Sequence, residues 1–334
     1  MKTYDKNIKL KYKTFLKMSL RKKVNLILFF LGIKPLIYKI LYFFLSFFIK
    51  SKMPFLRRII FDINTKKSKY IFFENKEKFL LFTRDQIISK EFFANDNFEF
   101  EKFQKVIDFL KKDYQITKLY DIGANIGVTC IPAVNRDLVK QAIAVEPESE
   151  NFKLLKLNIS LNNLEDKIKT FNYALSSENN KLLNLEVSDA TSGGHRIRLS
   201  NRKKGVHEEE KQEVQSVMSK TFDSLFPNIN SKEDLIWIDA QGFEPNILSG
   251  ADKLIISGAP VVIEFWPYAL KQNDFWQEMQ EIIKKFKFFS DISKDPFQII
   301  EINQKNIQEL FSGWDEEESS KHSLFTDLLL LSNK

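Results

Sequence analysis

Residues 119–127 read Leu-Tyr-Asp-Ile-Gly-Ala-Asn-Ile-Gly, an apolar run that ends in a turn bounded by glycines. Gly123 and Gly127 allow the backbone to turn sharply and to approach a ligand closely. Thr129 is suited to cap a following helix, and Pro132 falls in its first turn, where a missing backbone N–H costs nothing. The segment therefore predicts a strand, a tight loop and a helix, which together begin an α/β fold.

Strand-like and helix-like segments alternate along the rest of the chain. We predict strands over residues 69–73, 78–83, 118–122, 141–146, 168–174, 235–240, 260–265 and 324–331. We predict helices over residues 98–112, 129–138, 149–162, 243–250 and 274–286, and an irregular insert over about 182–218. Alternation of this kind is typical of βαβ units. The sequence therefore predicts a Rossmann-like, mostly parallel sheet with helices on both faces.

The composition indicates a folded protein and excludes several kinds of site. Hydrophobic residues make up 43% of the 334 residues and charged residues 28%, which is enough for a sizeable core. Cys130 is the single cysteine, which excludes an internal disulfide framework, and three scattered histidines exclude an ordinary Cys/His zinc site. We therefore expect a cytoplasmic protein.

Positive charge is concentrated in the first part of the chain. Residues 1–61 contain 15 Lys and Arg and one acid, Asp5, whereas the remaining residues contain 36 Lys and Arg and 43 Asp and Glu. A basic arm on an acidic body fits contact of the arm with an anionic membrane surface, or with a polyanion that only the arm touches. It argues against a nucleic-acid groove across the whole protein, so we expect no nucleic-acid partner.

Two apolar runs, residues 24–33 and 36–49, lie within this arm and are separated by Lys34 and Pro35. Neither run reaches the ~20 residues that a membrane span needs, and no small-residue cleavage site of a signal peptide follows them. Three interpretations remain: a helical hairpin packed on the body, a peripheral anchor at the inner face of the membrane, or a true span. We predict a helical extension over residues 1–66 and a second domain over 67–334.

The loop at Gly123 does not fit a dinucleotide. A Gly-x-Gly-x-x-Gly fingerprint needs glycine at the third and sixth positions counted from Gly123, where Asn125 and Val128 stand. Asp121 is placed to accept a hydrogen bond from an ammonium group, and Glu146, at the end of the next predicted strand, is placed for ribose hydroxyls. S-adenosylmethionine has those groups. The alternative is that both acids merely cap strand ends.

Seven motifs in order resemble the FkbM-type S-adenosylmethionine-dependent methyltransferases, and they cover about residues 117–265. They are Asp-Ile-Gly-Ala-Asn-Ile-Gly at 121–127, Val-Glu-Pro at 145–147 with Asn151 and Asn158 in the helix that follows, Asn-Tyr-Ala-Leu-Ser at 172–176, Thr-Phe-Asp-Ser-Leu at 221–225, Trp-Ile-Asp-Ala-Gln-Gly-Phe-Glu at 237–244, Leu-Ser-Gly-Ala at 248–251 and Pro-Val-Val-Ile-Glu at 260–264.

The resemblance implies a class I methyltransferase fold, with a seven-stranded sheet whose last strand is antiparallel. It also implies methyl transfer, usually to oxygen and often on a glycan or a natural product. The expected cofactor is S-adenosylmethionine, for which the predicted binding residues are Asp121, Gly123, Asn125, Gly127, Glu146 and Asn172.

Three acids and one histidine are the candidates for the acceptor side. Asp239 and Glu264 end predicted strands and Glu244 begins a helix, so we expect all three to point into one crevice. Asp239 or Glu264 would act as a base or orient the acceptor hydroxyl, or one of them would hold a divalent ion. The alternative for all three is a structural role as strand-end caps or helix-dipole partners. His195 is a candidate general base over the site, or an ordinary surface-loop histidine.

The chain departs from the family at two positions. Family members commonly read Lys-Ile-Asp-Val-Glu-Gly where this chain has Trp237 in place of the lysine and Gln241 in place of the glutamate. Three function classes remain: an O-methyltransferase acting on a glycan or another small hydroxyl acceptor, a methyltransferase-like cofactor-binding protein without catalysis, and a nucleic-acid methyltransferase. Nucleic-acid methyltransferases that act on amino groups often have an Asn/Asp-Pro-Pro-Tyr-type tetrapeptide after the fourth strand, where this chain reads Asp-Ala-Gln-Gly at 239–242. We predict the O-methyltransferase.

Overall fold

The structure is a computed structural model that describes residues 53–65, 67–189, 191–200, 212–312 and 325–332. The chain divides into two compact units, Met1–Ile60 and Phe61–Lys334. Both apolar runs of the predicted extension lie outside the described residues, whose first helix is α4 (Pro54–Thr65). No helix within the described ranges has the length and apolar character required to cross a membrane.

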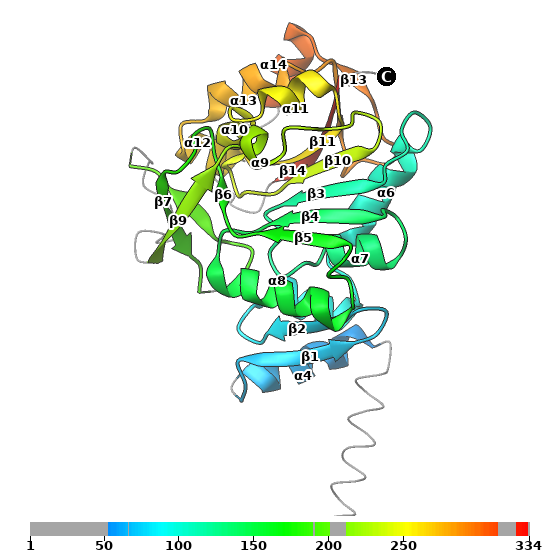
Figure 1. The fold of residues 1–334 in the computed structure, drawn as a ribbon, viewed down its shortest axis with the longest axis vertical. Coiled ribbons are helices and arrows are strands. Elements are labelled where there is room, and N and C mark those ends of the chain that lie inside the picture. The colour runs from blue at the N-terminus through cyan, green and yellow to red at the C-terminus, as the bar shows by residue number, and fades with distance from the viewer. Residues whose placement is uncertain (1–52, 66, 190, 201–211, 313–324, 333–334) are drawn as a thin grey trace, which may run out of the picture. The chain divides into compact units, whose positions relative to one another are not determined.

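An eight-stranded sheet forms the centre of the second unit (Figure 1). In spatial order its strands are β13 (Ile300–Glu301), β12 (Phe288–Asp291), β14 (Thr326–Leu331), β11 (Val261–Phe265), β10 (Asp234–Ile238), β3 (Lys118–Ile122), β4 (Gln141–Val145) and β5 (Ile168–Phe171). Strands β5, β4, β3, β10 and β11 are parallel, and β14 is antiparallel to both β11 and β12. The predicted α/β class is confirmed. Apart from the short β13, the sheet has the seven strands that the resemblance implied, with the last one antiparallel.

Helices cover both faces of this sheet. The described helices that follow α4 are α5 (Ile88–Asn95), α6 (Phe100–Leu110), α7 (Cys130–Asn135), α8 (Ser149–Leu161), α9 (Phe222–Leu225), α10 (Glu244–Leu248), α11 (Asp252–Ser257), α12 (Pro267–Gln272), α13 (Trp276–Ile283) and α14 (Gln304–Ser312). On one face, Ile236 and Ile263 share a core with Ile283 of α13. On the other face, Trp237 of β10 packs against Phe103 of α6, with ring centroids 5.7 Å apart. Strands buried on both faces explain the continuous apolar runs of the sequence.

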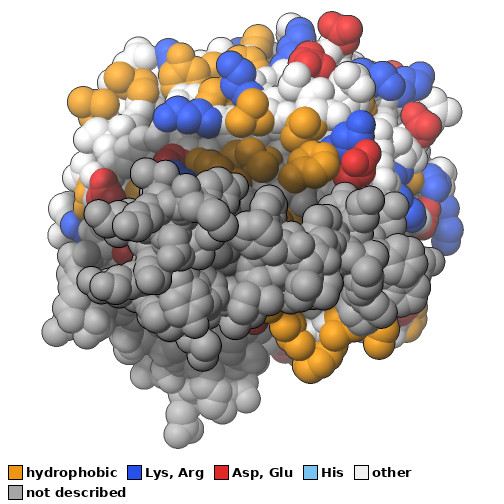
Figure 2. Space-filling view, turned by 90° about the horizontal axis from the view of Figure 1, so that it is seen from below, with side chains coloured by type: hydrophobic (Ala, Val, Ile, Leu, Met, Phe, Trp, Pro, Cys, Tyr) orange, Lys and Arg blue, Asp and Glu red, His pale blue; other side chains and the backbone are white. Residues whose placement is uncertain are grey.

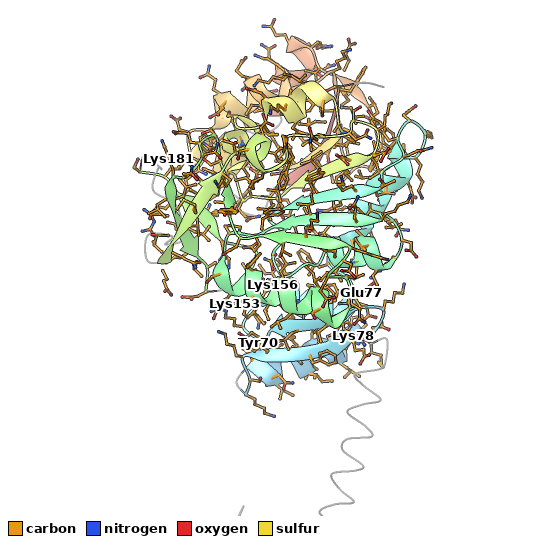
Figure 3. All side chains as sticks on the ribbon, viewed as in Figure 1. Tyr70, Glu77, Lys78, Lys153, Lys156 and Lys181 are labelled. Carbon is orange, nitrogen blue, oxygen red and sulfur yellow. The ribbon has the colours of Figure 1, made fainter. Side chains whose placement is uncertain are left out.

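Strands β1 (Tyr70–Glu74) and β2 (Lys78–Phe82) form an antiparallel hairpin that packs against α8. Asn158 of α8 and Asn162, which directly follows the helix, bind the backbone of β2. The Asn158 side chain accepts the Leu80 N–H at 2.7 Å, and that of Asn162 accepts the Lys78 N–H at 2.9 Å. Figure 3, where Lys78 is labelled, shows the hairpin and α8 side by side. The two asparagines therefore take the place of a neighbouring strand at this sheet edge.

An ion pair also holds the hairpin. The guanidinium of Arg136, which follows α7, donates to both carboxylate oxygens of Glu77 at 2.8 Å. Glu77, labelled in Figure 3, is 3% exposed. Because both oxygens are bound by one planar group, the pair fixes the hairpin turn against α7.

The prediction of an irregular insert over 182–218 is wrong. Within the described residues, this region forms a second sheet in the order β6 (Ala174–Leu175), β9 (Glu213–Lys220), β7 (Leu182–Val187) and β8 (Arg196–Arg198). The sequence did not predict these strands because polar residues occupy many of their positions. Glu186, for example, is fully buried and accepts a hydrogen bond from Arg198 at 2.6 Å. Strands β12 and β13 were also not predicted.

The described surface seen from below mixes side chains of every kind. Figure 2 shows Lys and Arg side chains interspersed with acidic and hydrophobic ones.

Candidate active site

A cleft opens at the carboxyl ends of β3, β4 and β10, where open α/β sheets bind their ligands. Residues of the glycine loop and of β4 line one part of it, residues of α6 and β10 line another, and the insert contributes a third. The residues that line the cleft include Glu99, Lys102, Phe103, Asp121, Gly123, Asn125, Glu146, Tyr173, Leu175, Ser192, His195, Ile197, Trp237, Asp239, Gln241 and Asp327.

The glycine loop has the backbone that its sequence predicts. Gly123 and Gly127 adopt φ of +87° and +94°, and Asn125 adopts φ of +52°. A Cβ atom on Gly123 would overlap the carbonyl oxygen of Asp239. The loop therefore lies directly against the end of β10, and only glycine fits at this position.

Asp121 lies at the base of the cleft. It is 3% exposed, and its Oδ2 accepts the backbone N–H of Cys130 at 3.1 Å. Burial raises the pKa of Asp121 to about 7. The carboxyl group is therefore close to half-ionised at neutral pH, and a cationic ligand group would favour the ionised form.

Glu146 ends β4 and faces the cleft with both carboxylate oxygens held by the backbone. Its Oε2 accepts the Asn125 N–H and its Oε1 accepts the Glu148 N–H, both at 2.8 Å. Glu146 is 4% exposed, and burial raises its pKa to about 8. Each oxygen retains acceptor capacity, so the group is oriented for ligand hydroxyls.

Asn172, predicted to bind the cofactor, does not line the cleft. Its Nδ2 donates to the carbonyl oxygens of Glu146 and Pro147, at 2.8 and 3.1 Å. The side chain holds the loop that carries Glu146, while its neighbour Tyr173 lines the cleft. Asn172 thus stabilises the backbone at Glu146 and does not itself line the predicted site.

The insert closes one side of the cleft at Ser192. The carbonyl oxygen of Ser192 accepts from Asn125 Nδ2 at 2.7 Å and from Asn151 Nδ2 at 2.9 Å. Its hydroxyl lies 2.7 Å from Asp85 Oδ2. One residue of the insert is thereby fixed to the glycine loop, to α8 and to the segment before α5.

His195 lies in the cleft in a defined tautomer. Its Nδ1 accepts the Ser188 backbone N–H at 2.9 Å, so the neutral ring carries its proton on Nε2. Nε2 is buried and has no hydrogen-bond partner among the residues that the structure describes. Burial also lowers the pKa of His195. A neutral ring with a protonated Nε2 donates a hydrogen bond, so this geometry does not suit the predicted general base.

The three acids of the acceptor side do not all reach the cleft, contrary to expectation. Asp239 lines it. Glu264, 6% exposed, lies behind Gln241, whose Nε2 is 3.0 Å from Glu264 Oε2 and 2.9 Å from Asp239 Oδ1. Glu244 is fully buried, and its Oε1 accepts the N–H groups of Ala240 and Gly242 at 2.8 and 3.2 Å.

These positions set the pKa values of the acids. Desolvation by the walls of the cleft, reinforced by Asp327 and Glu99, raises the pKa of Asp239 to about 6, although the side chain is open to the cleft. Burial raises the pKa of Glu244 to about 8 and that of Glu264 well above its usual range. Asp239 is therefore the one of the three that is ionised near neutral pH and accessible to a ligand.

A divalent ion is not favoured between these acids. An amide N–H of Gln241 occupies the place between Asp239 and Glu264 where a shared cation would lie. Among the residues that the structure describes, no three Asp, Glu, His or Cys side chains are grouped for metal binding.

A comparison with protein families matches residues 121–291 to the methyltransferase FkbM domain. The chain belongs to the FkbM methyltransferase family. The match begins at Asp121 of the glycine loop and includes Glu146, the insert, Asp239 and Glu264.

Solved structures with a similar arrangement include other methyltransferases. The FkbM methyltransferase from Methylobacillus flagellatus is 14% identical, with a TM-score of 0.36, and the match covers 64% of this chain and 43% of that protein. TYW2 from P. horikoshii, solved in complex with MeSAdo, is 14% identical, with a TM-score of 0.37 and coverage of 80% and 73%. The B. subtilis M1A22 tRNA methyltransferase TrmK is 12% identical, with a TM-score of 0.34 and coverage of 70% and 66%.

The chain thus spans less than half of the length of the M. flagellatus protein. Comparison with curated proteins yields no match.

The structure also explains how this FkbM family member accommodates Trp237 and Gln241. The Trp237 ring lines the cleft against Phe103, and the Gln241 amide bridges two carboxyl groups. Sequence reasoning did not find Lys102 and Asp327, which form a 2.9 Å ion pair in the cleft wall. They lie 225 positions apart, and no local pattern relates them.

Proposed function

We propose that this FkbM family member is an S-adenosylmethionine-dependent methyltransferase that methylates a hydroxyl group of a glycan or another small acceptor. The observation that supports this most is that one cleft contains both the glycine loop with Glu146 and the ionisable Asp239. Binding residues for a nucleoside and a candidate base thus open into the same space.

The residues of the loop suit this cofactor. Glu146 has two oriented oxygens for the ribose hydroxyls, and Asp121 offers a carboxylate for the ammonium group. The backbone at Gly123 has no side chain to obstruct close approach. Apolar side chains of Leu175 and Ile197 also line the cleft and suit a purine ring.

The chain's own contribution to the chemistry is positioning and proton transfer. When bound, S-adenosylmethionine supplies an electrophilic methyl group on a sulfonium centre. Asp239, which lines the same cleft, would hold the acceptor hydroxyl in place and accept the proton that the hydroxyl loses on methylation. A carboxylate with a pKa of about 6 is ionised at neutral pH and accepts a hydrogen bond from the hydroxyl. The rest of the rate enhancement would come mainly from holding both reactants in line.

We call the part of the cleft that is lined by Glu99, Lys102, Phe103, Trp237, Asp239 and Asp327 the acceptor wall. Its charge favours an acceptor without phosphates. Glu99, Asp239 and Asp327 line it with a single base, Lys102, which is already paired with Glu99 and Asp327 at 3.0 and 2.9 Å. A nucleic-acid backbone would meet net repulsion there. Aromatic side chains of Phe103 and Trp237 line the same wall and suit the apolar face of a sugar ring.

Binding of S-adenosylmethionine tests the proposal. Calorimetry should show binding by the wild-type chain, and Glu146→Ala should weaken it about 10- to 100-fold, because the variant loses two hydrogen bonds to the ribose that contribute about 0.5–1.5 kcal/mol each. Glu146→Gln keeps one acceptor oxygen and should lose less. Glu101→Ala, at an exposed position of α6, is the matched control and should bind normally. Unchanged affinity in Glu146→Ala, or preferred binding of a nicotinamide dinucleotide, would contradict the assignment.

A further inference from the structure

Gln241 occupies an unusual position in the turn after β10. Its side-chain Nε2 lies 2.9 Å from Asp239 Oδ1, and 3.2 and 3.0 Å from the two carboxyl oxygens of Glu264. One amide group therefore contacts two acids, one open to the cleft and one behind it. The opposite orientation of the amide would turn its carbonyl oxygen toward the carboxyl oxygens, so the N–H groups are the ones that face the acids.

The backbone at Gln241 is held in the left-handed region, with φ of +55°. This conformation costs a non-glycine residue on the order of 1 kcal/mol, and asparagine or glycine tolerates it better than glutamine does. The following residue, Gly242, also has positive φ, at +89°. The turn thus holds a strained backbone at the residue whose side chain reaches both acids.

The chemistry of the side chain explains why an amide suits this place. An amide has two N–H donors and no charge, so it satisfies carboxyl oxygens without adding to their repulsion. A glutamate here would bring a third carboxyl group within about 3 Å of the other two, and its negative charge would raise the pKa of Asp239 by like-charge repulsion. An apolar side chain would leave buried carboxyl oxygens without a donor.

We propose that Gln241 is the positioning residue of the acceptor site, whose amide orients the Asp239 carboxylate toward the cleft and holds it ionised while tying it to Glu264. This inference rests on the proposed role of Asp239 as the proton acceptor. Gln241 itself does not exchange a proton with the acceptor. It acts through Asp239.

Other groups also act on the charge of Asp239, and the test must hold them constant. The acids around it repel the ionised form, and Lys102 on α6 stabilises it. The acids come from five elements or turns: Glu99 before α6, Asp121 on β3, Glu244 on α10, Glu264 on β11 and Asp327 on β14. Substitution of Gln241 leaves all of these groups in place.

Carbon-13 NMR titration of protein labelled at the aspartate side-chain carboxyl carbons measures the ionisation of Asp239 directly. The Asp239→Asn variant assigns the signal. We expect Gln241→Glu to raise the apparent pKa of Asp239 by about 1–2, since it removes a donor and adds a like charge. Gln241→Met, which removes the donor without adding charge, should raise it by less. It also keeps the test open if Gln241→Glu fails to fold.

The control is Gln277→Glu, which adds the same charge at an exposed position of α13. It should leave the Asp239 titration unchanged. An Asp239 titration that does not move in either Gln241 variant would overturn the inference, as would an equal change in Gln277→Glu. The titration requires neither cofactor nor acceptor. Calorimetry with S-adenosylmethionine on the wild-type chain therefore tests the proposed function separately, and loss of binding there would leave the titration result intact.

Discussion

Asp239 differs from the other acids near the end of β10 because it is both accessible to a ligand and ionised near neutral pH. The walls of the cleft raise its pKa to about 6, whereas Glu244 and Glu264 lie outside the lining of the cleft. An acid of this kind can accept a proton at the pH of the cell without remaining protonated in the resting protein.

Asp239→Asn should therefore reduce methyl transfer about 100-fold and change the affinity for S-adenosylmethionine by less than about twofold. Transfer of labelled methyl to sugar fractions gives the rate, and calorimetry gives the affinity. In the wild type, the rate should be about tenfold lower at pH 5 than on the plateau above pH 7, because the base must be ionised. Asp166→Asn, at an exposed position, is the control. Parallel loss of affinity and rate would show that Asp239 binds the cofactor instead.

Glu244 illustrates a buried acid that supports a turn. Its Oε1 accepts two backbone N–H groups, its Oε2 has no partner within the described part of the chain, and burial raises its pKa to about 8. The folded protein holds this proton more tightly than the unfolded chain, where the pKa is 4.5. The contribution of Glu244 to the free energy of unfolding is therefore fully present below pH 4.5 and is lost as the pH rises toward 8.

Glu244→Gln removes this titration while preserving the shape of the side chain. Relative to the wild type, the variant should gain up to about 1.4 kcal/mol of unfolding free energy for each unit of pH between 5 and 8. Urea denaturation at pH 5 and pH 8 measures the difference. The neighbouring acids titrate in both proteins, so their effects largely cancel. A constant difference across this range would mean that Glu244 is already ionised in the folded state.

At the scale of elements, α8 connects the β1–β2 hairpin to the glycine loop. The Asn158 amide bonds both the N–H and the carbonyl of Leu80, and it donates to the Ile126 carbonyl at 3.0 Å. Asn158 is fully buried. One side chain thus supports a strand edge and the loop proposed to hold the cofactor.

Asn158→Ala should destabilise the protein by about 2–4 kcal/mol, because it leaves buried backbone groups without partners. It should also weaken binding of S-adenosylmethionine, since the loop loses its contact at Ile126. Chemical denaturation and calorimetry measure the two effects. Leu157→Ala, at the adjacent position that is 52% exposed, is the control and should change neither quantity appreciably. Full stability in Asn158→Ala would mean that water replaces the amide.

At the scale of the whole molecule, charge divides the sequence into a basic first part and an acidic remainder. Residues 1–61 contain 15 Lys and Arg and one acid. We propose that this segment attaches the chain to an anionic membrane surface, where each base can contribute about 1 kcal/mol at low salt.

The full-length chain should sediment with vesicles that contain anionic lipid at low salt, and high salt should release at least part of it. Vesicles of zwitterionic lipid should retain less, which separates the electrostatic part from apolar insertion. Failure to sediment with anionic vesicles at low salt would contradict the proposal. Retention in high salt and alkali alike would instead support a spanning segment.

The sequence by itself determined the strand, loop and helix around residues 119–135, and the strands of the central sheet other than β12 and β13. Those features depend on local patterns: apolar runs, glycines where the backbone needs positive φ, and alternation of strands with helices. The sequence also predicted that Asp239, Glu244 and Glu264 point into one crevice, because the carboxyl ends of parallel strands meet at one edge of the sheet. Of these three, only Asp239 lines the cleft, together with Asp121 and Glu146.

Only the tertiary structure decided which candidate side chains reach that cleft. Glu264 is excluded because a strained turn places Gln241 in front of it, and Glu244 is excluded because it turns inward to backbone N–H groups. His195 is a donor because Ser188, seven residues away, sets its tautomer. These outcomes depend on side-chain direction and on contacts between distant residues, such as Asn125 with Ser192, 67 positions apart. A local pattern contains no information about such contacts, since packing and hydrogen-bond satisfaction select them only when the whole chain is folded.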